Sequence, residues 1–227
     1  SKANGNDIKV IANYSKFPQG IGLVVRTDKG INTAQDLSGK RIALQTGTML
    51  HEMLIKLLEK NNIDVDSVEV VGMPSPDAAN AIVQGQVDAA IIPEPLLTKV
   101  VSSGEVELLR TAEGLILGQS FIAVRTEFLS QYPEVVKKFL QVHQNTLNWT
   151  DLNKEDALTL ASETIQMPQQ MVAKLYPKFD FTMKITESEI ENLKSSAHFL
   201  QDWGFIKENV DTEALIEDLI DISYLPR

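Results

Sequence analysis

Residues 40–48 read Lys-Arg-Ile-Ala-Leu-Gln-Thr-Gly-Thr, and residues 85–95 read Gly-Gln-Val-Asp-Ala-Ala-Ile-Ile-Pro-Glu-Pro. Each segment contains a short apolar run that is typical of a buried strand. The first run leads through a glycine into a helix-periodic stretch, and the second leads into a loop that two prolines restrict. In open α/β sheets, ligands lie at the carboxyl ends of the strands. The two segments therefore predict half of a small-molecule pocket.

Strands and helices alternate from residue 40 to about residue 109, which favours a parallel sheet with right-handed crossovers. Ahead of this region, residues 8–12 and 20–26 predict two more strands. Residues 120–125 form an apolar run that ends in arginine, as residues 23–26 do. We expect these two runs to be strands that pass between two lobes.

The chain is predicted to be helical from residue 132 onward. Pro133 suits the start of a helix, where its missing N–H costs nothing. One apolar face is expected on this helix, made by Val135, Val136, Phe139, Leu140, His143 and Leu147. Further helices are expected at 155–165, 168–175 and 187–203, with a last one capped by Asp211.

The composition of the 227 residues is that of an ordinary globular protein, with 43% hydrophobic and 23% charged residues. A net charge of -10 without a Lys/Arg cluster argues against nucleic-acid binding. No apolar run approaches the roughly 20 residues of a membrane span, so no direct membrane insertion is expected. Cysteine is absent, which excludes disulfides, thiolate zinc sites and cysteine nucleophiles. Without a signal peptide at Ser1, we expect a cytosolic protein or a processed, mature form.

Gly47 and its two threonine neighbours form the first candidate binding site. A glycine ahead of a helix allows a ligand to approach the backbone closely, and the helix N-terminus offers N–H groups and a partial positive charge. The hydroxyls of Thr46 and Thr48 add donors. The set suits a carboxylate, sulfonate, nitrate or phosphate-like group, and the alternative is that Thr48 only caps the helix. The P-loop pattern is absent.

Glu94 is the second candidate, because Pro93 and Pro95 hold it in a restricted loop. Its carboxylate can accept hydrogen bonds from an amine, amide or ring nitrogen of a ligand. The alternative is an acid at a helix start that the helix dipole favours. A helix N-terminus argues for an anionic end of the ligand and Glu94 for a donor-bearing end. A small zwitterion, aminosulfonate or aminopyrimidine satisfies both, whereas nitrate alone leaves Glu94 without a purpose.

Weaker candidates for ligand contact are His51 in the first turn of a helix, Asp77 at another helix start, and Gln119 with Ser120 ahead of a strand. Each has a structural alternative: a buried histidine, an N-cap, or ordinary strand polarity. No catalytic residue, metal or cofactor is expected, because no serine nucleophile motif, metal-ligand spacing or dinucleotide fingerprint is present. The residues present therefore indicate the binding of a ligand rather than the breaking of a bond.

Residues 31–45 resemble a signature of the solute-binding proteins of ABC importers for nitrate, sulfonate, taurine and thiamine precursors. Asp36-Leu37 and Gly39-Lys40-Arg41 match it directly. Residues 46–48 resemble the family's small-residue turn, and residues 132–134 resemble its Pro-Glu helix start. A further family segment is matched by Gly85, Val87, Asp88, Ala89, Glu94 and Pro95.

This resemblance implies an α/β, bilobal, periplasmic-binding-protein-like fold, in which crossing strands join two α/β lobes and a hinge motion traps the ligand between them. Residues 27–119 would form the second lobe. Residues 1–26 and 120–227 would form a partial first lobe with the C-terminal helices. The implied partner is the membrane permease of an ABC importer, and the implied location is periplasmic or extracytoplasmic, with a lipid anchor conceivable in a full-length precursor.

One departure from the family pattern concerns the start of the chain. The family usually opens with two more strand–helix units before the strand that matches residues 8–12. The chain is then a fragment, or its first lobe is reduced, or another chain completes it. Two other functions stay open: an enzyme of the menaquinone- or pyrimidine-pathway type on the same scaffold, and a ligand-sensing module. The pyrimidine type resembles a cysteine-bearing pattern that this chain lacks.

Overall fold

The computed structural model describes residues 2–226, and the chain divides into two compact units. Unit 1 consists of Ser1–Lys16 and Gln119–Arg227, and unit 2 is Phe17–Gly118. The sequence placed the first boundary after Arg26, and the structure places it after Lys16. The reason is that residues 21–26 pair on both sides with strands of unit 2, so they belong to its sheet and do not pass between units.

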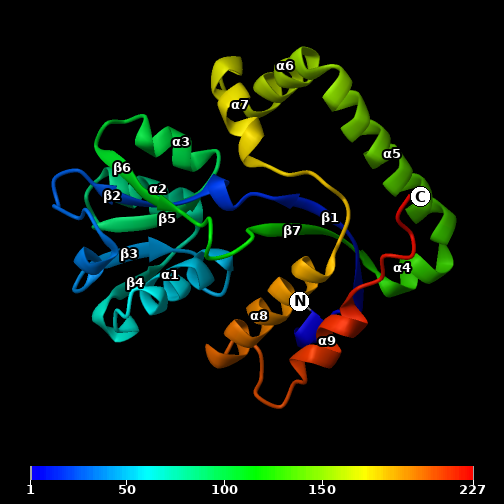
Figure 1. Ribbon diagram of the computed structural model, residues 1–227, viewed down its shortest axis with the longest axis horizontal. Helices are drawn as coiled ribbons and strands as arrows, with labels where there is room; N and C mark the ends of the chain where they lie inside the picture. The colour runs from blue at the N-terminus through cyan, green and yellow to red at the C-terminus, as the bar shows by residue number, and fades with distance from the viewer. Residues whose placement is uncertain (1, 227) are drawn as a thin grey trace. The chain divides into compact units, whose positions relative to one another are not determined.

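Unit 2 is built on a five-stranded sheet with the strand order β4-β3-β5-β2-β6 (Figure 1). Strands β3, β4 and β5 are parallel, as the strand–helix alternation predicts, whereas β2 is antiparallel to both β5 and β6. No strand–helix–strand crossover leads into β2, so nothing constrains it to run parallel. The strands are β2 (Ile21–Arg26), β3 (Arg41–Leu44), β4 (Glu69–Gly72), β5 (Ala89–Pro93) and β6 (Val106–Thr111).

The helices of unit 2 are α1 (Met49–Lys60), α2 (Ser75–Val83) and α3 (Leu96–Val101). Successive residues of a strand point to opposite faces of a sheet. Leu23 and Val25 therefore pack in one core with the apolar face of α1, while Val24 packs in a second core with α2 and α3. Both faces of the sheet are covered, and the carboxyl end of β3 is joined directly to the turn that starts α1.

Unit 1 contains a two-stranded antiparallel sheet of β1 (Ile8–Lys16) and β7 (Gln119–Arg125). The sequence predicted that residues 23–26 and 120–125 are the two strands that pass between lobes. The structure pairs β7 with β1, whereas residues 23–26 lie in the sheet of unit 2. The pairing register shifts between Val10 and Ala12 and again between Asn13 and Ser15. These irregularities explain why the apolar–polar alternation of β1 is imperfect.

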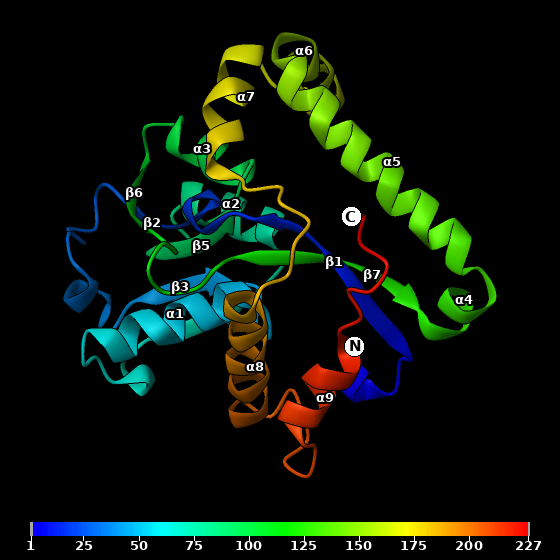
Figure 2. The ribbon, with the colours of Figure 1, turned by 45° about the vertical axis from the view of Figure 1, so that its right-hand side comes forward.

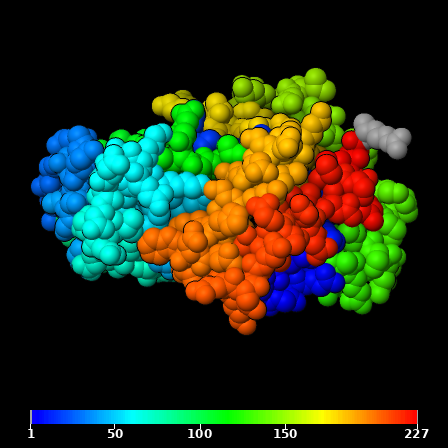
Figure 3. Space-filling model, turned by 60° about the horizontal axis from the view of Figure 1, so that its bottom comes forward, coloured from blue at the N-terminus to red at the C-terminus, as the bar shows by residue number. Residues whose placement is uncertain are grey.

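Helices make up most of the rest of unit 1, in agreement with the sequence prediction. They are α4 (Thr126–Gln131), α5 (Pro133–Leu152), α6 (Lys154–Ile165), α7 (Gln169–Leu175), α8 (Glu187–Asp202) and α9 (Thr212–Leu219). The N-terminal segment lies against α9 beside α8 (Figure 3). There Asp218 pairs with Lys2 and Lys9 at 2.7 Å each, and these hydrogen bonds lower the pKa of Asp218 to about 2. Within residues 2–226, no helix combines the length and apolar character that a membrane crossing requires.

The structure corrects the single apolar face that the sequence predicted for α5. Val136 and Leu140 are buried against β1 and β7, but Val135 and Phe139 are each 54% exposed. The apolar residues of α5 therefore form two stripes, of which only one is covered by the described part of unit 1.

Candidate functional site

The turn at Thr46–Thr48 connects β3 to α1 in unit 2. Gly47 has a φ of +70°, a left-handed conformation that glycine adopts without steric cost and β-branched residues avoid. Thr48 is the N-cap of α1: its Oγ1 accepts a hydrogen bond from the Leu50 amide at 3.2 Å and donates one to the Gln45 carbonyl at 2.7 Å. The capping role of Thr48 that the sequence left open is therefore present.

The backbone amides in the first turn of α1 differ in whether they have a hydrogen-bond acceptor. The Thr48 carbonyl accepts from the His51 amide at 3.0 Å and from the Glu52 amide at 3.1 Å. Within residues 2–226, no hydrogen bond reaches the amide of Met49, the first helical residue. Thr46, in the same turn, is exposed. A 12-residue helix carries a partial positive charge at this end, so the turn is able to hold an anionic group.

Glu94 follows β5 and binds the next helix. Its Oε2 accepts from the Thr98 amide at 3.0 Å, and its Oε1 accepts from the Thr98 hydroxyl at 3.0 Å. Its own amide donates to the Gly20 carbonyl at 2.8 Å. Both carboxylate oxygens are therefore engaged at the start of α3, which agrees with the alternative of an acid at a helix start. Ligand contact by Glu94 stays a prediction.

Replacement of Glu94 with alanine is expected to lower the free energy of unfolding by about 1 kcal/mol, because the Thr98 amide loses its side-chain acceptor. Urea denaturation of the purified chain measures this loss. Thr98→Val is the matched variant, because it removes the hydroxyl but keeps the hydrogen bond from the residue 98 backbone amide to Glu94. It should lower the free energy of unfolding by less than Glu94→Ala does. Equal stabilities of Glu94→Ala and the parent chain would contradict the capping role.

His51 and Asp77 have different environments in unit 2. The His51 side chain lies on α1 and is 3% exposed, and burial lowers its pKa, which favours the neutral ring. This environment agrees with the structural alternative of a buried histidine. Asp77 is exposed in the first turn of α2, but the N-cap is Pro74 and not Asp77, which corrects the capping role expected from the sequence. Contact of either residue with a ligand stays a prediction.

Gln119 and Ser120 open β7 in unit 1. The Gln119 Oε1 accepts from the Asn192 side chain on α8 at 2.8 Å, and the hydroxyls of Ser120 and Ser15 are 2.8 Å apart. The Gln119 Nε2 is buried and has no hydrogen-bond partner within residues 2–226. The same holds for the Oδ1 of Asn13 on β1, a fully buried residue. Buried polar atoms of this kind are rare and call for a ligand or water.

Asn13 is a polar residue of the site that was not predicted from the sequence, although its place in an apolar strand is a signal. Asparagine is depleted in strands, and Asn13 interrupts the apolar run of residues 8–12 directly at its end. Its side-chain amide donates to the Thr182 carbonyl at 2.7 Å, from a segment 169 residues away in the chain. Such a partner cannot be inferred from local pattern.

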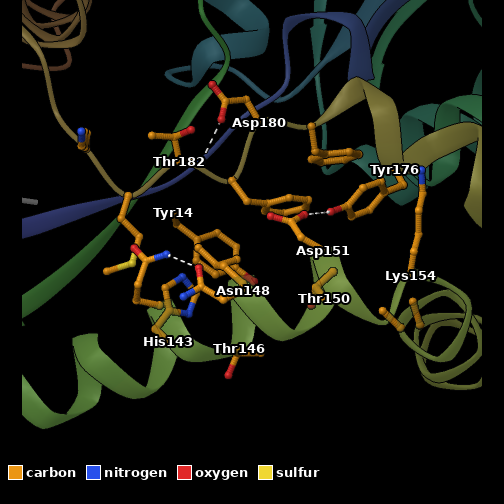
Figure 4. A pocket seen from close by; sticks show the side chains of 18 of the residues that line it. Tyr14, His143, Thr146, Asn148, Thr150, Asp151, Lys154, Tyr176, Asp180 and Thr182 are labelled. Carbon is orange, nitrogen blue, oxygen red and sulfur yellow. Dashed lines mark hydrogen bonds between the residues drawn. The ribbon is translucent and has the colours of Figure 1, made fainter. Parts of the chain in front are cut away.

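A groove of about 1050 Å³ lies within unit 1, between α5, α6, α7 and the segment 179–184 (Figure 4). Aromatic rings line it: Phe179 and Phe181 stack with centroids 5.7 Å apart, and Tyr14 stacks on His143 at 5.8 Å. The Tyr176 hydroxyl donates to Asp151 at 3.4 Å, and burial together with Asp151 raises the pKa of Tyr176. Local sequence does not predict this groove, because its lining comes from segments far apart in the chain.

Comparison with known proteins identifies relatives of the whole chain. A putative aliphatic sulfonates-binding protein of Bacillus subtilis is 24% identical over 227 residues, which cover all of this chain and 68% of that protein. Among solved structures, the alkanesulfonate-binding protein SsuA of Xanthomonas axonopodis pv. citri, bound to MOPS, matches with a TM-score of 0.85 at 20% identity. That match covers 97% of this chain and 75% of SsuA.

A more distant structural match is the desulfurization enzyme DSZB, with a TM-score of 0.68 at 16% identity over 92% of this chain and 76% of that one. Both structural matches show the fold, which is the α/β, periplasmic-binding-protein-like fold expected from the sequence. The model of the NMT1/THI5-like family matches residues 1–157, which is more than half of the chain. The chain therefore belongs to the NMT1/THI5-like family.

Proposed function

We propose that this chain is the solute-binding component of an ABC importer and that it binds a small organic sulfonate. The observation that carries the proposal is the turn at Thr46–Thr48, where a left-handed glycine and the unbonded Met49 amide meet at the positive end of α1. The B. subtilis relative and SsuA, both sulfonate-binding proteins by name, support a sulfonate as the ligand class.

In the proposed binding mode, sulfonate oxygens accept hydrogen bonds from the Met49 amide and from the hydroxyl of Thr46. Thr48 positions the helix end, since its hydroxyl already donates to Gln45. Glu94 offers less to an amine than the sequence suggested, because Thr98 occupies both of its oxygens. This favours a plain alkanesulfonate over an aminosulfonate.

The proposal extends to location and partner. A periplasmic or extracytoplasmic site of action and a membrane permease as partner are supported by SsuA of other bacteria, described as the periplasmic sulfonate-binding protein of an ABC transporter. A fusion of the chain to a periplasmic export signal, followed by cell fractionation and crosslinking to permease subunits, tests both statements.

Ligand binding should raise the thermal stability of the chain. A ligand at 100 times its Kd adds about 2.7 kcal/mol to the free energy of unfolding. We expect this stabilisation with ethanesulfonate or butanesulfonate, a smaller one with taurine, and none with nitrate. Differential scanning fluorimetry screens the four compounds, and titration calorimetry gives the affinities. If all four leave both readouts unchanged, the proposed ligand class is wrong.

An enzyme on the same scaffold is the second candidate, because the desulfurization enzyme DSZB shares the fold. The two functions differ in the fate of the ligand. A binding protein returns its sulfonate intact, whereas an enzyme that removes sulfur breaks the carbon–sulfur bond. With water, R–SO3⁻ then gives R–H and hydrogen sulfate, or R–OH and hydrogen sulfite. Incubation of the chain with the best-bound sulfonate, followed by detection of sulfate and sulfite, separates the two functions.

A further inference from the structure

We propose that the groove of unit 1 is a further binding site and that it takes a small aromatic zwitterion, a free aromatic amino acid being the simplest example. The groove is the one lined by α5, α6, α7 and the segment 179–184. It lies wholly within unit 1, whereas the Thr46–Thr48 turn belongs to unit 2. The proposal therefore does not depend on the proposed sulfonate site.

The walls of the groove are held by packed helices. Figure 2 shows α5 leading into α6 and α7, after which the chain returns toward α8 in an extended segment. Leu158 on α6 and Val172 on α7 line the groove and are buried together in one apolar cluster. Sites for small molecules are mostly preformed hollows of about 300–1,000 Å³. A groove of about 1050 Å³ with packed walls has the size and the rigidity of such a site.

One side of the groove is a series of aromatic rings. Phe181 stands at its centre, with its ring centroid 5.7 Å from that of Phe179 and 5.9 Å from that of Tyr176. The planes of Phe179 and Phe181 differ by only 8°. Aromatic rings prefer offset-stacked or edge-to-face neighbours at these distances. The series therefore favours a ligand that carries a flat ring over an aliphatic one.

Two opposite charges flank Tyr176 next to these rings (Figure 4). Asp151, on α5, accepts from the Tyr176 hydroxyl at 3.4 Å, and the Lys154 Nζ lies 5.6 Å from the centre of the Tyr176 ring. Within residues 2–226, neither charge belongs to an ion pair, although both lie beside the same ring. A ligand ammonium group is able to donate to Asp151, and a ligand carboxylate is able to accept from Lys154.

The other acidic residue of the groove differs from Asp151 in this respect. Asp180 lies 3.0 Å from the Lys16 Nζ and accepts from the Thr182 amide at 2.8 Å, so its charge is already compensated. Asp151 and Lys154 are thus the pair left for a ligand. A lone carboxylate selects a cation and a lone ammonium group selects an anion, but the two together select a molecule with both charges. Beside the aromatic rings, that molecule is an aromatic zwitterion.

Four probes of similar size separate the parts of this recognition. Phenylalanine has the ring and both charges, 3-phenylpropionate lacks the amine, phenethylamine lacks the carboxylate, and 3-cyclohexylalanine lacks the flat ring. Titration calorimetry of the complete chain measures the affinity for each. We expect phenylalanine to bind at least tenfold more tightly than each of the other three. The proposal is overturned if phenylalanine does not bind or if 3-cyclohexylalanine binds equally well.

Three variants test the site itself. Asp151→Asn should weaken phenylalanine and phenethylamine at least fivefold and leave 3-phenylpropionate unchanged. Lys154→Met should weaken phenylalanine and 3-phenylpropionate and leave phenethylamine unchanged. Phe181→Leu should weaken all three aromatic probes. Each charge variant has a matched control at an exposed position of unit 1 that does not line the groove.

The controls are Asp156→Asn and Lys138→Met, which should leave every affinity unchanged. If Asp151→Asn and Lys154→Met weaken all probes alike, or if the controls weaken phenylalanine as much as they do, the groove is not the site. The crosswise pattern of losses also distinguishes ligand contact from a general effect on folding, because a destabilised unit 1 would lose all probes together. Failure of the chain to bind ethanesulfonate would contradict the sulfonate proposal and leave these results unaffected.

Discussion

Gly47→Val is expected to abolish sulfonate binding. A valine side chain at a φ of +70° is strained by about 1–3 kcal/mol, and the turn relieves this strain by rotating its peptide groups away from the end of α1. The branched side chain also fills the space through which an anion approaches the Met49 amide. Titration calorimetry with the best sulfonate of the screen should show a loss of affinity of at least 100-fold.

Gly39→Val is the control variant that distinguishes the effect of backbone strain from the loss of the binding site. Gly39 has a φ of +73° in the same unit, and nothing lies within 4 Å of the position that its side chain would take. The two valine variants should therefore lose similar stability in urea, but only Gly47→Val should lose affinity. Equal affinities in these two variants would show that the turn is not the binding site.

Lys16→Met is expected to destabilise unit 1 by about 3 kcal/mol, because it leaves a buried carboxylate without its cation. The Lys16 Nζ lies 2.8 Å from Glu189 Oε1 and 3.0 Å from Asp180 Oδ2, and the Glu189 side chain is only 6% exposed. The pair also joins β1 to α8, since Glu189 completes the capping box of that helix with Thr186. Urea denaturation, monitored by the exchange of α8 amides, measures the loss.

Two controls accompany this variant. Lys137→Met removes the exposed partner of Glu134 and should cost less than about 0.5 kcal/mol, since both side chains are in water. The double variant Lys16→Met with Glu189→Gln no longer buries a charge and should regain part of the loss. A loss for Lys16→Met no larger than that for Lys137→Met would refute the role of the buried pair.

The same pair predicts the acid dependence of stability. Burial acts to raise the pKa of Glu189, but the hydrogen bonds from Lys16 and Thr186 outweigh it and lower this pKa from 4.5 to about 2. A carboxylate with a lowered native pKa stabilises the fold above its unfolded pKa. This contribution should therefore be complete above pH 4.5 and disappear as the pH falls towards 2. In Lys16→Met, the slope of stability against pH in this window should flatten.

Local pattern predicted the elements well. The apolar residues that make the stretch after Gly47 helix-periodic are all buried: Leu50, Met53, Leu54, Leu57 and Leu58. Helical periodicity reports burial reliably where a helix has one covered face, as α1 has. On α5 the same rule fails, because periodicity does not say whether each of two adjoining apolar stripes has a partner. Val135 and Phe139 were expected on the same face as Val136 and Leu140 for this reason, although they are exposed.

In the candidate site, too, local sequence predicted some features and tertiary contacts decided the others. Thr46, Gly47 and Thr48 are consecutive, so their arrangement at the start of a helix follows from local sequence, and the left-handed glycine agrees with it. For Glu94, local sequence left two roles open, and only the hydrogen bonds with Thr98 distinguish them. Asn13 and Gln119 gain their significance from partners on distant segments, Thr182 and Asn192.

The sequence by itself determined the order of strands and helices, the turn ahead of α1 and the family to which the chain belongs. These properties depend on hydrophobic periodicity and on short motifs, which act over neighbouring residues. Only the tertiary structure decided that β2 lies inside the sheet of unit 2, that Lys16 neutralises Glu189, and that one side of α5 is uncovered. Burial and pairing between distant segments arise from packing, and packing depends on which surfaces meet after the elements have formed.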